Sequence, residues 1–247
     1  VSAETIKELS KDKKYLGAKI GFTSVLHTWG QNLSLHPHIH MIVPGGGIDS
    51  NGKWKNSKKK FFLPVKVVSK LFKGKFLSYT KKNFDQRKIK DEEQFQNIIN
   101  TCYSKDRVVY TKKPMKSAKH VVKYLGRYTH RIAISNARIK KYEDNKVTFS
   151  YKDYSDHNQI KEMTLDDTEF FRRYMMHVLP PNFMKIRHYG FLGNRNKEER
   201  IKAVRTATNT KNPGPLLIDY EQIISDILKR DVSICIKCGQ KRHYQLE

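Results

Sequence analysis

The chain of 247 residues is strongly basic, with 49 Lys and Arg against 24 Asp and Glu and a formal net charge of +25. A basic excess of this size is typical of proteins that bind a polyanion, although a basic protein of ribosomal type would share it. No run approaches the roughly 18 apolar residues of a spanning helix, and no signal-peptide pattern opens the chain, which argues against a membrane protein. Three cysteines are too few for a disulfide framework and favour a reducing cytoplasm.

Hydrophobic periodicity and turn residues divide the chain into helices and strands. After a first helix at 2–14, strands are expected at 19–27 and 35–43, and the turn at 29–32 joins them into an antiparallel hairpin. The later elements are expected, in chain order, as helices at 61–79 and 91–104, a strand at 107–112, a helix at 118–128, a strand at 146–154 and a helix at 169–178.

The second strand of the hairpin carries His38 and His40 with Ile39 between them. Side chains alternate along a strand, so both imidazoles lie on one face and we expect Ile39 to be buried behind them. Such a pair is often only structural, but two imidazoles on one face also make half of a divalent-metal site. His27 and Gln31 could each approach from the hairpin partner as a third ligand, and we favour Gln31.

Tyr124 and Tyr128 lie four residues apart in the helix expected at 118–128. At a rise of about 1.5 Å per residue they share one helix face, about 6 Å apart along the axis. Aromatic residues at this spacing are more often core, but the surrounding stretch is strongly basic, which favours a phenolate and also holds phosphates. A metal ion and two phenols suit the attack of a phenolate on a DNA phosphodiester.

Three runs of sequence resemble the transposases of the IS-ninety-one group of insertion sequences, which are two-tyrosine HUH endonucleases related to rolling-circle replication initiators. The resemblance extends over about 16–194, and its motifs occur in the family's order. The runs are LHTWGQNLSLHPHIHMIVPGGG at 26–47, KHVVKYLGRYTHRIAISNARI at 119–139 and FFRRYMMHVLPPNFMKIRHYGFLGN at 170–194.

The resemblance implies an α+β fold for 1–194, with an HUH endonuclease-like central antiparallel sheet and flanking helices. It implies that His38 and His40 bind Mg²⁺ or Mn²⁺ and that Tyr124 and Tyr128 are the nucleophiles. The implied reaction cleaves and rejoins single-stranded DNA at transposon ends and target through a 5′-phosphotyrosine, in the bacterial or archaeal cytoplasm at the nucleoid. A replication initiator or relaxase-type nickase would use the same site, and a non-catalytic DNA-binding remnant is a third interpretation.

Family members normally carry a cysteine-rich zinc-binding segment ahead of this region. The chain begins at Val1 without one, so we expect it to be a fragment. The sequence does not indicate an oligomeric state. Side chains expected to contact DNA are the phosphate-binding Arg127, Arg131, Arg172, Arg173 and Arg187 and the base-stacking Tyr189 and Phe191.

Residues 195–247 are expected to form a basic C-terminal extension, helical and irregular, which is polar up to the stretch at 216–228. Near its end, Cys235 and Cys238 have the spacing of half a zinc knuckle. His243 could add one ligand for Zn²⁺, but no second cysteine pair follows. We therefore favour the interpretation that this motif is a vestigial or truncated site.

Overall fold

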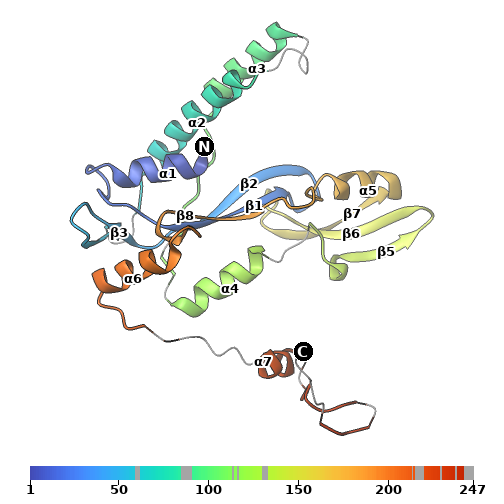
Figure 1. Cartoon of the computed structure of the whole chain (residues 1–247). Coiled ribbons are helices and arrows are strands. Elements are labelled where there is room, and N and C mark those ends of the chain that lie inside the picture. The colour runs from blue at the N-terminus through green and yellow to red at the C-terminus, as the bar shows by residue number, and fades with distance from the viewer. Residues whose placement is uncertain are drawn as a thin grey trace. The chain divides into compact units, whose positions relative to one another are not determined.

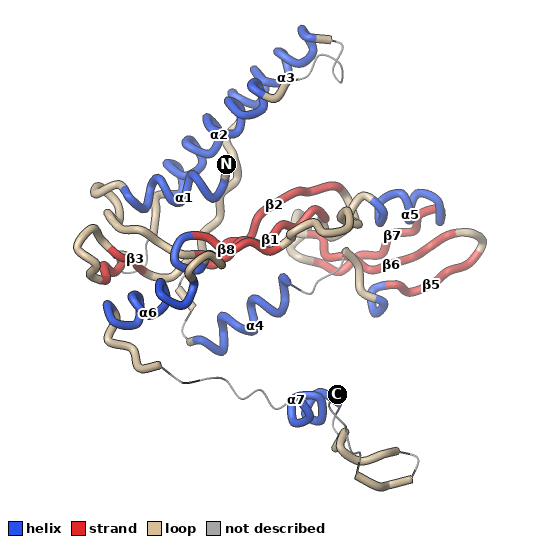
Figure 2. Tube along the Cα trace, viewed as in Figure 1, coloured by secondary structure: helices blue, strands red, loops and turns tan. Residues whose placement is uncertain are grey.

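The computed structural model has a mixed α+β architecture with antiparallel sheets (Figures 1 and 2). Its contacts divide the chain into two units, Val1–Asn209 and Thr210–Glu247. Among the described residues, no helix is long and apolar enough to cross a membrane. The structure describes residues 1–58, 62–84, 91–112, 114–115, 117–129, 133–212, 214, 220–228, 230–236 and 238–241.

A three-stranded antiparallel sheet of order β2-β1-β8 forms the centre of the first unit. Its strands are β1 (Phe22–Trp29), β2 (Leu35–Ile42) and β8 (Ile186–Tyr189). The predicted hairpin is confirmed, because β1 and β2 pair antiparallel. Figure 1 shows α1 (Ser2–Lys11) and α4 (Ala118–Thr129) on opposite sides of this sheet. One face of the sheet therefore packs on α1, and the other meets α4.

The expectation that Ile39 is buried is wrong, since its side chain is 46% exposed. The face of the sheet opposite the histidines is covered only near the start of β1. There Phe22 packs with Leu16 and Ile20 and with residues of α1. Ile39 lies farther along β2, the edge strand of the sheet, beyond this core. Alternation along the strand correctly predicted the sheet face on which Ile39 lies, but not that its side chain is exposed.

A second antiparallel sheet, β5-β6-β7, consists of β5 (Ile139–Glu143), β6 (Lys146–Asp153) and β7 (Gln159–Asp166). Only β6 was predicted. It buries Val147 and Phe149 on one face, whereas every residue of β5 is exposed and β7 has no buried residue. Helix α5 (Asp167–Met175) follows and buries Phe170 against Phe149 of β6. Leu33, in the turn between β1 and β2, is fully buried in the same cluster.

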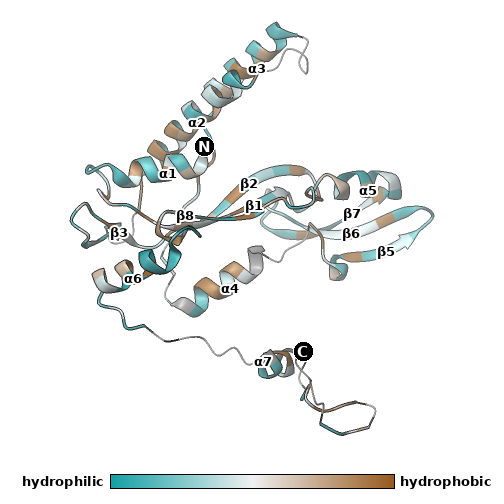
Figure 3. Cartoon of the chain, viewed as in Figure 1, coloured by the Kyte–Doolittle hydropathy of each residue, from teal (hydrophilic) through white to brown (hydrophobic). Residues whose placement is uncertain are grey.

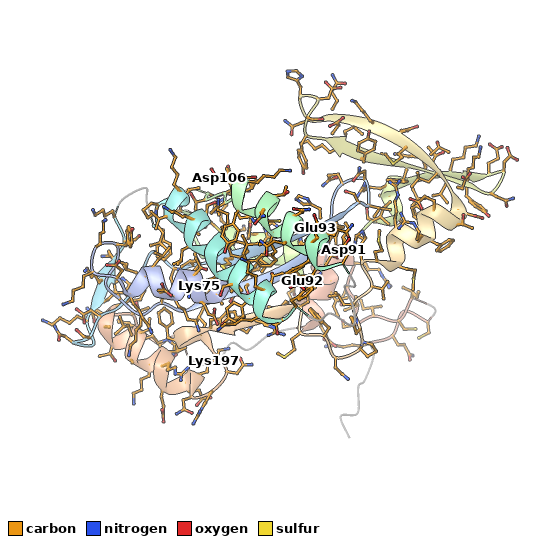
Figure 4. The ribbon with its side chains drawn as sticks, turned by 90° about the horizontal axis from the view of Figure 1, so that it is seen from above. Lys75, Asp91, Glu92, Glu93, Asp106 and Lys197 are labelled. Carbon is orange, nitrogen blue, oxygen red and sulfur yellow. The ribbon has the colours of Figure 1, made fainter. Side chains whose placement is uncertain are left out.

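The N-terminal half of the first unit contains three helices. They are α1, α2 (Val65–Lys82) and α3 (Glu92–Ser104). Each of them shows hydrophilic and hydrophobic segments side by side in Figure 3, as expected for helices that bury one face. Figure 4 shows α2 and α3 from above, with Lys75 on α2 and the acidic start of α3 labelled. Lys75 pairs with Glu8 of α1 at 2.9 Å, which links α2 to α1.

The strand predicted at 107–112 is wrong, because this segment forms no strand in the structure. Side chains of α2 bind backbone carbonyls at the start of this segment and just before it. Ser69 Oγ donates to the carbonyl of Arg107 at 2.6 Å, and Lys73 Nζ donates to the carbonyls of Tyr103 and Lys105. A run rich in β-branched residues thus lies outside the sheets.

The remaining elements are short or lie toward the C-terminus. A ribbon of β3 (Gly46–Ile48) and β4 (Trp54–Asn56) follows the central hairpin, and 3-10 turns lie at η1 (Asn136–Arg138) and η2 (Gly190–Leu192). Helix α6 (Lys197–Ala207) packs on η2, so the first unit continues to Asn209. The second unit contains α7 (Tyr220–Leu228), which lies in the extension expected to be helical and irregular.

Gly190 directly follows β8 and lies against the backbone of Ile20, just before β1. Its φ of +61° favours glycine, and a Cβ at this position would lie 1.8 Å from the carbonyl oxygen of Ile20. Arg200 of α6 donates to the carbonyl of Gly190 at 3.0 Å. The backbone therefore leaves no room for a side chain here.

We predict that Gly190→Ala lowers the free energy of unfolding by more than about 3 kcal/mol, because strain at positive φ adds to a clash with backbone. Gly52→Ala is the matched control, since Gly52 has a φ of +75° and a Cβ added there would meet nothing within 4 Å. It should cost only about 1 kcal/mol. Urea denaturation measures both, and equal losses would contradict the proposed clash.

Candidate metal centre

Three histidines from the two strands of the central hairpin converge on one face of the sheet. His27 lies opposite His38 in the register of β1 and β2, and His40 lies two residues further along β2. One ligand nitrogen from each ring can be chosen so that all three lie within 4.8 Å of one another. The strand pairing therefore brings together three imidazoles that are separated in the sequence.

The surroundings fix the orientation of His27. Its side chain is only 3% exposed, and its ring stacks on Trp29 with centroids 4.6 Å apart. Lys185 Nζ lies 5.0 Å from the centre of the Trp29 ring. Burial lowers the pKa of the Lys185 ammonium. The stacked pair holds His27 toward the other two imidazoles.

Hydrogen bonding and burial suit the other two rings to bind a cation. His38 Nδ1 lies 2.7 Å from the carbonyl oxygen of His36, so Nδ1 carries the proton and Nε2 offers its lone pair. Burial is the largest cause that lowers the pKa of the His40 ring to about 4, and charges on its histidine neighbours and on Lys112 contribute. His40 is therefore neutral at pH 7, the form that binds a metal.

The donor set fits a divalent transition-metal ion. Imidazole nitrogen suits first-row transition metals, whereas Mg²⁺ prefers oxygen ligands. Three protein ligands leave coordination positions open for water or a substrate oxygen, as in catalytic sites. Among the two ions expected from the resemblance, the nitrogen ligands favour Mn²⁺ over Mg²⁺.

Tyr124 reaches this cluster from α4. Its hydroxyl and His40 Nδ1 are hydrogen-bonded at 3.2 Å, although 84 residues separate them in the sequence. Lys112 Nζ lies 5.6 Å from the centre of the Tyr124 ring. Tyr128 lies one turn further along the same helix, as the sequence predicted, while its side chain is outside the described part.

Gln31, the third ligand that we favoured, lies just after β1. Its side-chain amide donates to the Tyr154 hydroxyl at 3.4 Å. The structure places His27, the alternative, beside His38 and His40. Metal binding by Gln31 stays a prediction, and His27 is the histidine ligand that the geometry offers.

The arginines expected to bind phosphate lie in different surroundings. Arg172 and Arg173 of α5 both donate to Glu169, whose pKa their hydrogen bonds lower to about 2. Arg187 lies opposite Ser24, on the sheet face away from the histidines. The side chain of Arg127 and the whole of Arg131 are outside the described residues.

The two aromatic residues expected to stack on bases are packed within the protein. Tyr189 stacks on Phe22 at 5.0 Å and lies beneath Lys7. Phe191 lies so close to Gly21 that a Cβ there would be 2.5 Å from its ring. Tyr189 packs against the core cluster around Phe22, and Phe191 contacts Trp54. Stacking of either ring on a base stays a prediction.

In the second unit, Cys235 and Cys238 lie in a tight turn. The N–H of Gly239 donates to the carbonyl of Cys235 at 2.8 Å, and Gly239 has a φ of +70°. This turn brings the two thiols of the motif onto one short loop. His243, the suggested further ligand, lies outside the described residues.

Comparison with known proteins identifies relatives along the whole chain. Residues 21–200 match the family model Y2_Tnp, whose description reads "Putative transposase". The chain is 39% identical over its full length to "Putative transposase y4qJ" of Sinorhizobium fredii, and 29% identical over 94% of its length to the transposase for insertion sequence element IS801 of Pseudomonas savastanoi pv. phaseolicola. It spans 65% of the first relative and 58% of the second. No solved structure matches the chain significantly.

We predict that His27→Ala weakens Mn²⁺ binding at least tenfold, because one of three nitrogen ligands is lost. Isothermal titration measures the affinity, and circular dichroism checks that the variant is folded. His36→Ala is the matched control, since His36 is an exposed histidine of the same hairpin outside the cluster. A larger loss in Gln31→Ala than in His27→Ala would identify Gln31 as the third ligand instead.

Proposed function

The chain belongs to the Y2_Tnp transposase family, and on that premise we propose that it is the DNA-cleaving part of an insertion-sequence transposase with an HUH endonuclease-like fold. One observation carries the proposal. The hydroxyl of Tyr124 lies 3.2 Å from His40, a member of a cluster of three imidazoles that can hold a metal. A nucleophile and a Lewis-acid site are thereby adjacent, as phosphodiester cleavage requires.

Tyr124 is the nucleophile in this proposal. Its phenolic oxygen forms a bond to the phosphorus of single-stranded DNA, and the bond from phosphorus to the 3′ oxygen breaks. The phenol loses its proton and the departing 3′ oxygen gains one, so the products are a 5′-phosphotyrosine and a 3′-hydroxyl. Mg²⁺ or Mn²⁺ bound by His27, His38 and His40 would polarise the phosphodiester and stabilise developing charge. Because one phosphodiester is exchanged for another, no nucleotide cofactor is needed.

Tyr128 is proposed as the second nucleophile because it follows Tyr124 by one helical turn on α4. A second phenol lets the protein open another strand before the first covalent link is resolved. Strand transfer from the transposon end to a target then proceeds between two tyrosines on one helix. The polarity of the covalent link and the transfer step rest on the resemblance to the IS-ninety-one group.

DNA binding follows from the transposase family and agrees with the net charge of +25. Arg127 is proposed to contact phosphate because it lies between the two tyrosines on α4. Arg131, Arg172, Arg173 and Arg187 remain proposed contacts to more distant phosphates. Zn²⁺ is proposed only as a second ion, at Cys235 and Cys238 of the C-terminal extension.

We predict that Tyr124→Phe reduces covalent adduct formation with single-stranded DNA at least a hundredfold, because only the nucleophilic hydroxyl is removed. Tyr124→Phe combined with Tyr128→Phe should form none. Labelled oligonucleotides tiled across the DNA that flanks the gene provide the substrate, with Mn²⁺ present and adducts resolved on denaturing gels. Tyr142→Phe, in an exposed strand of the second sheet, is the control and should react like the wild type.

An adduct that persists in the double variant would mean that the nucleophile is another residue. Absence of any adduct with the wild-type chain, together with intact DNA binding, would favour a non-catalytic DNA-binding remnant. Cleavage restricted to a plasmid origin would favour a replication initiator or relaxase.

A further inference from the structure

Lys112 is the cation that lies beside the proposed nucleophile. It lies in the segment between α3 and α4, and its Nζ lies 5.6 Å from the centre of the Tyr124 ring. The hydroxyl of the same tyrosine lies 3.2 Å from His40 Nδ1, so Lys112 lies beside the phenol that contacts the histidine cluster. From the sequence, Lys112 is expected only to end a strand, and no motif indicates a function for it.

The backbone that leads to Lys112 is held in place from α2. Ser69 Oγ donates to the carbonyl of Arg107 at 2.6 Å, and Lys73 Nζ donates to the carbonyl of Lys105 at 3.3 Å. Val109 packs against the buried cluster around Leu63. A segment outside any sheet is thus anchored a few residues before it reaches the site.

Lys112 differs from the lysines that form ion pairs elsewhere in the unit. Lys73 pairs with Asp106 at 3.5 Å, and Lys161 pairs with Asp153 at 2.9 Å. Within the described residues, Lys112 has no carboxylate partner, and its side chain is exposed. The positive charge beside Tyr124 is therefore available to an anion that enters the site.

We propose that Lys112 is a further catalytic residue, which contacts the phosphate attacked by Tyr124. This inference rests on the proposed function. A phosphodiester between the Tyr124 hydroxyl and the three imidazoles brings its charged oxygens close to the ammonium group. Negative charge on these oxygens increases as the new bond forms, so a fixed cation stabilises the transition state more than the bound substrate.

An alternative role for Lys112 is to pack against the Tyr124 ring and hold it in place. The two roles predict different effects of substitution. Met retains the length and the apolar stem of lysine but has no charge, whereas Arg retains the charge. If Lys112 contacts phosphate, removing its charge should lower the rate. If Lys112 only packs against the ring, changing the shape of its side chain should lower the rate.

The experiment compares Lys112→Met and Lys112→Arg in the complete chain, with Mn²⁺ and the tiled single-stranded oligonucleotides as probes. Single-turnover adduct formation gives the rate, and fluorescence anisotropy gives the affinity for DNA. Lys112→Met should lower the rate at least tenfold and change the dissociation constant less than threefold, whereas Lys112→Arg should keep most of the rate. Lys66→Met, an exposed lysine on α2, should match the wild type.

A wild-type rate in Lys112→Met would overturn the inference, as would equal losses in the Met and Arg variants. Either result would leave the proposed function intact, because the wild-type chain would still form its adduct. Failure of the wild-type chain to form any adduct would overturn the proposed function and this inference with it. Unchanged Mn²⁺ affinity in Lys112→Met, measured by titration, excludes an indirect effect through the metal ligands.

Discussion

The register of the β1–β2 hairpin is the constraint on which the candidate site depends. A shift of one residue would move all side chains of one strand to the other face, and His27 would no longer lie beside His38. The hairpin turn is fixed by Leu33, which is fully buried in the core of the second sheet. His177 adds two hydrogen bonds, one to the Leu33 carbonyl and one to the Thr28 hydroxyl.

The second sheet therefore supports the candidate metal site through the hairpin turn. Arg138 donates to the carbonyl of Gln31 in the hairpin turn and to the carbonyl of Ser150 on β6 at 2.7 Å. Arg173 of α5 donates to the carbonyl of Asn32 at 3.4 Å. These bonds join the turn to the sheet and helix that follow α4. Arginines in this region thus have a structural role that a count of basic residues does not reveal.

Local patterns in the sequence predicted the hairpin, the shared face of His38 and His40, and the helix that carries both tyrosines. They failed where distant parts of the chain decide the outcome. The strand expected at 107–112 is absent, and Ser69 of α2 binds the carbonyl of Arg107 in this segment. Metal binding by Gln31 stays a prediction, and the register that places His27 opposite His38 could be counted back from the hairpin turn. The proximity of Lys112 to Tyr124 has no signal in the sequence.

The central claim is that three imidazoles from two paired strands hold one metal ion beside Tyr124. Electron–nuclear double resonance of the Mn²⁺-loaded chain, labelled with ¹⁵N-histidine, tests it most directly. The structure predicts nitrogen couplings from three histidines, with one of them lost in His27→Ala and none lost in His36→Ala. Couplings from only two histidines that persist unchanged in His27→Ala, or a spectrum of Mn²⁺ bound by water alone, would contradict the account.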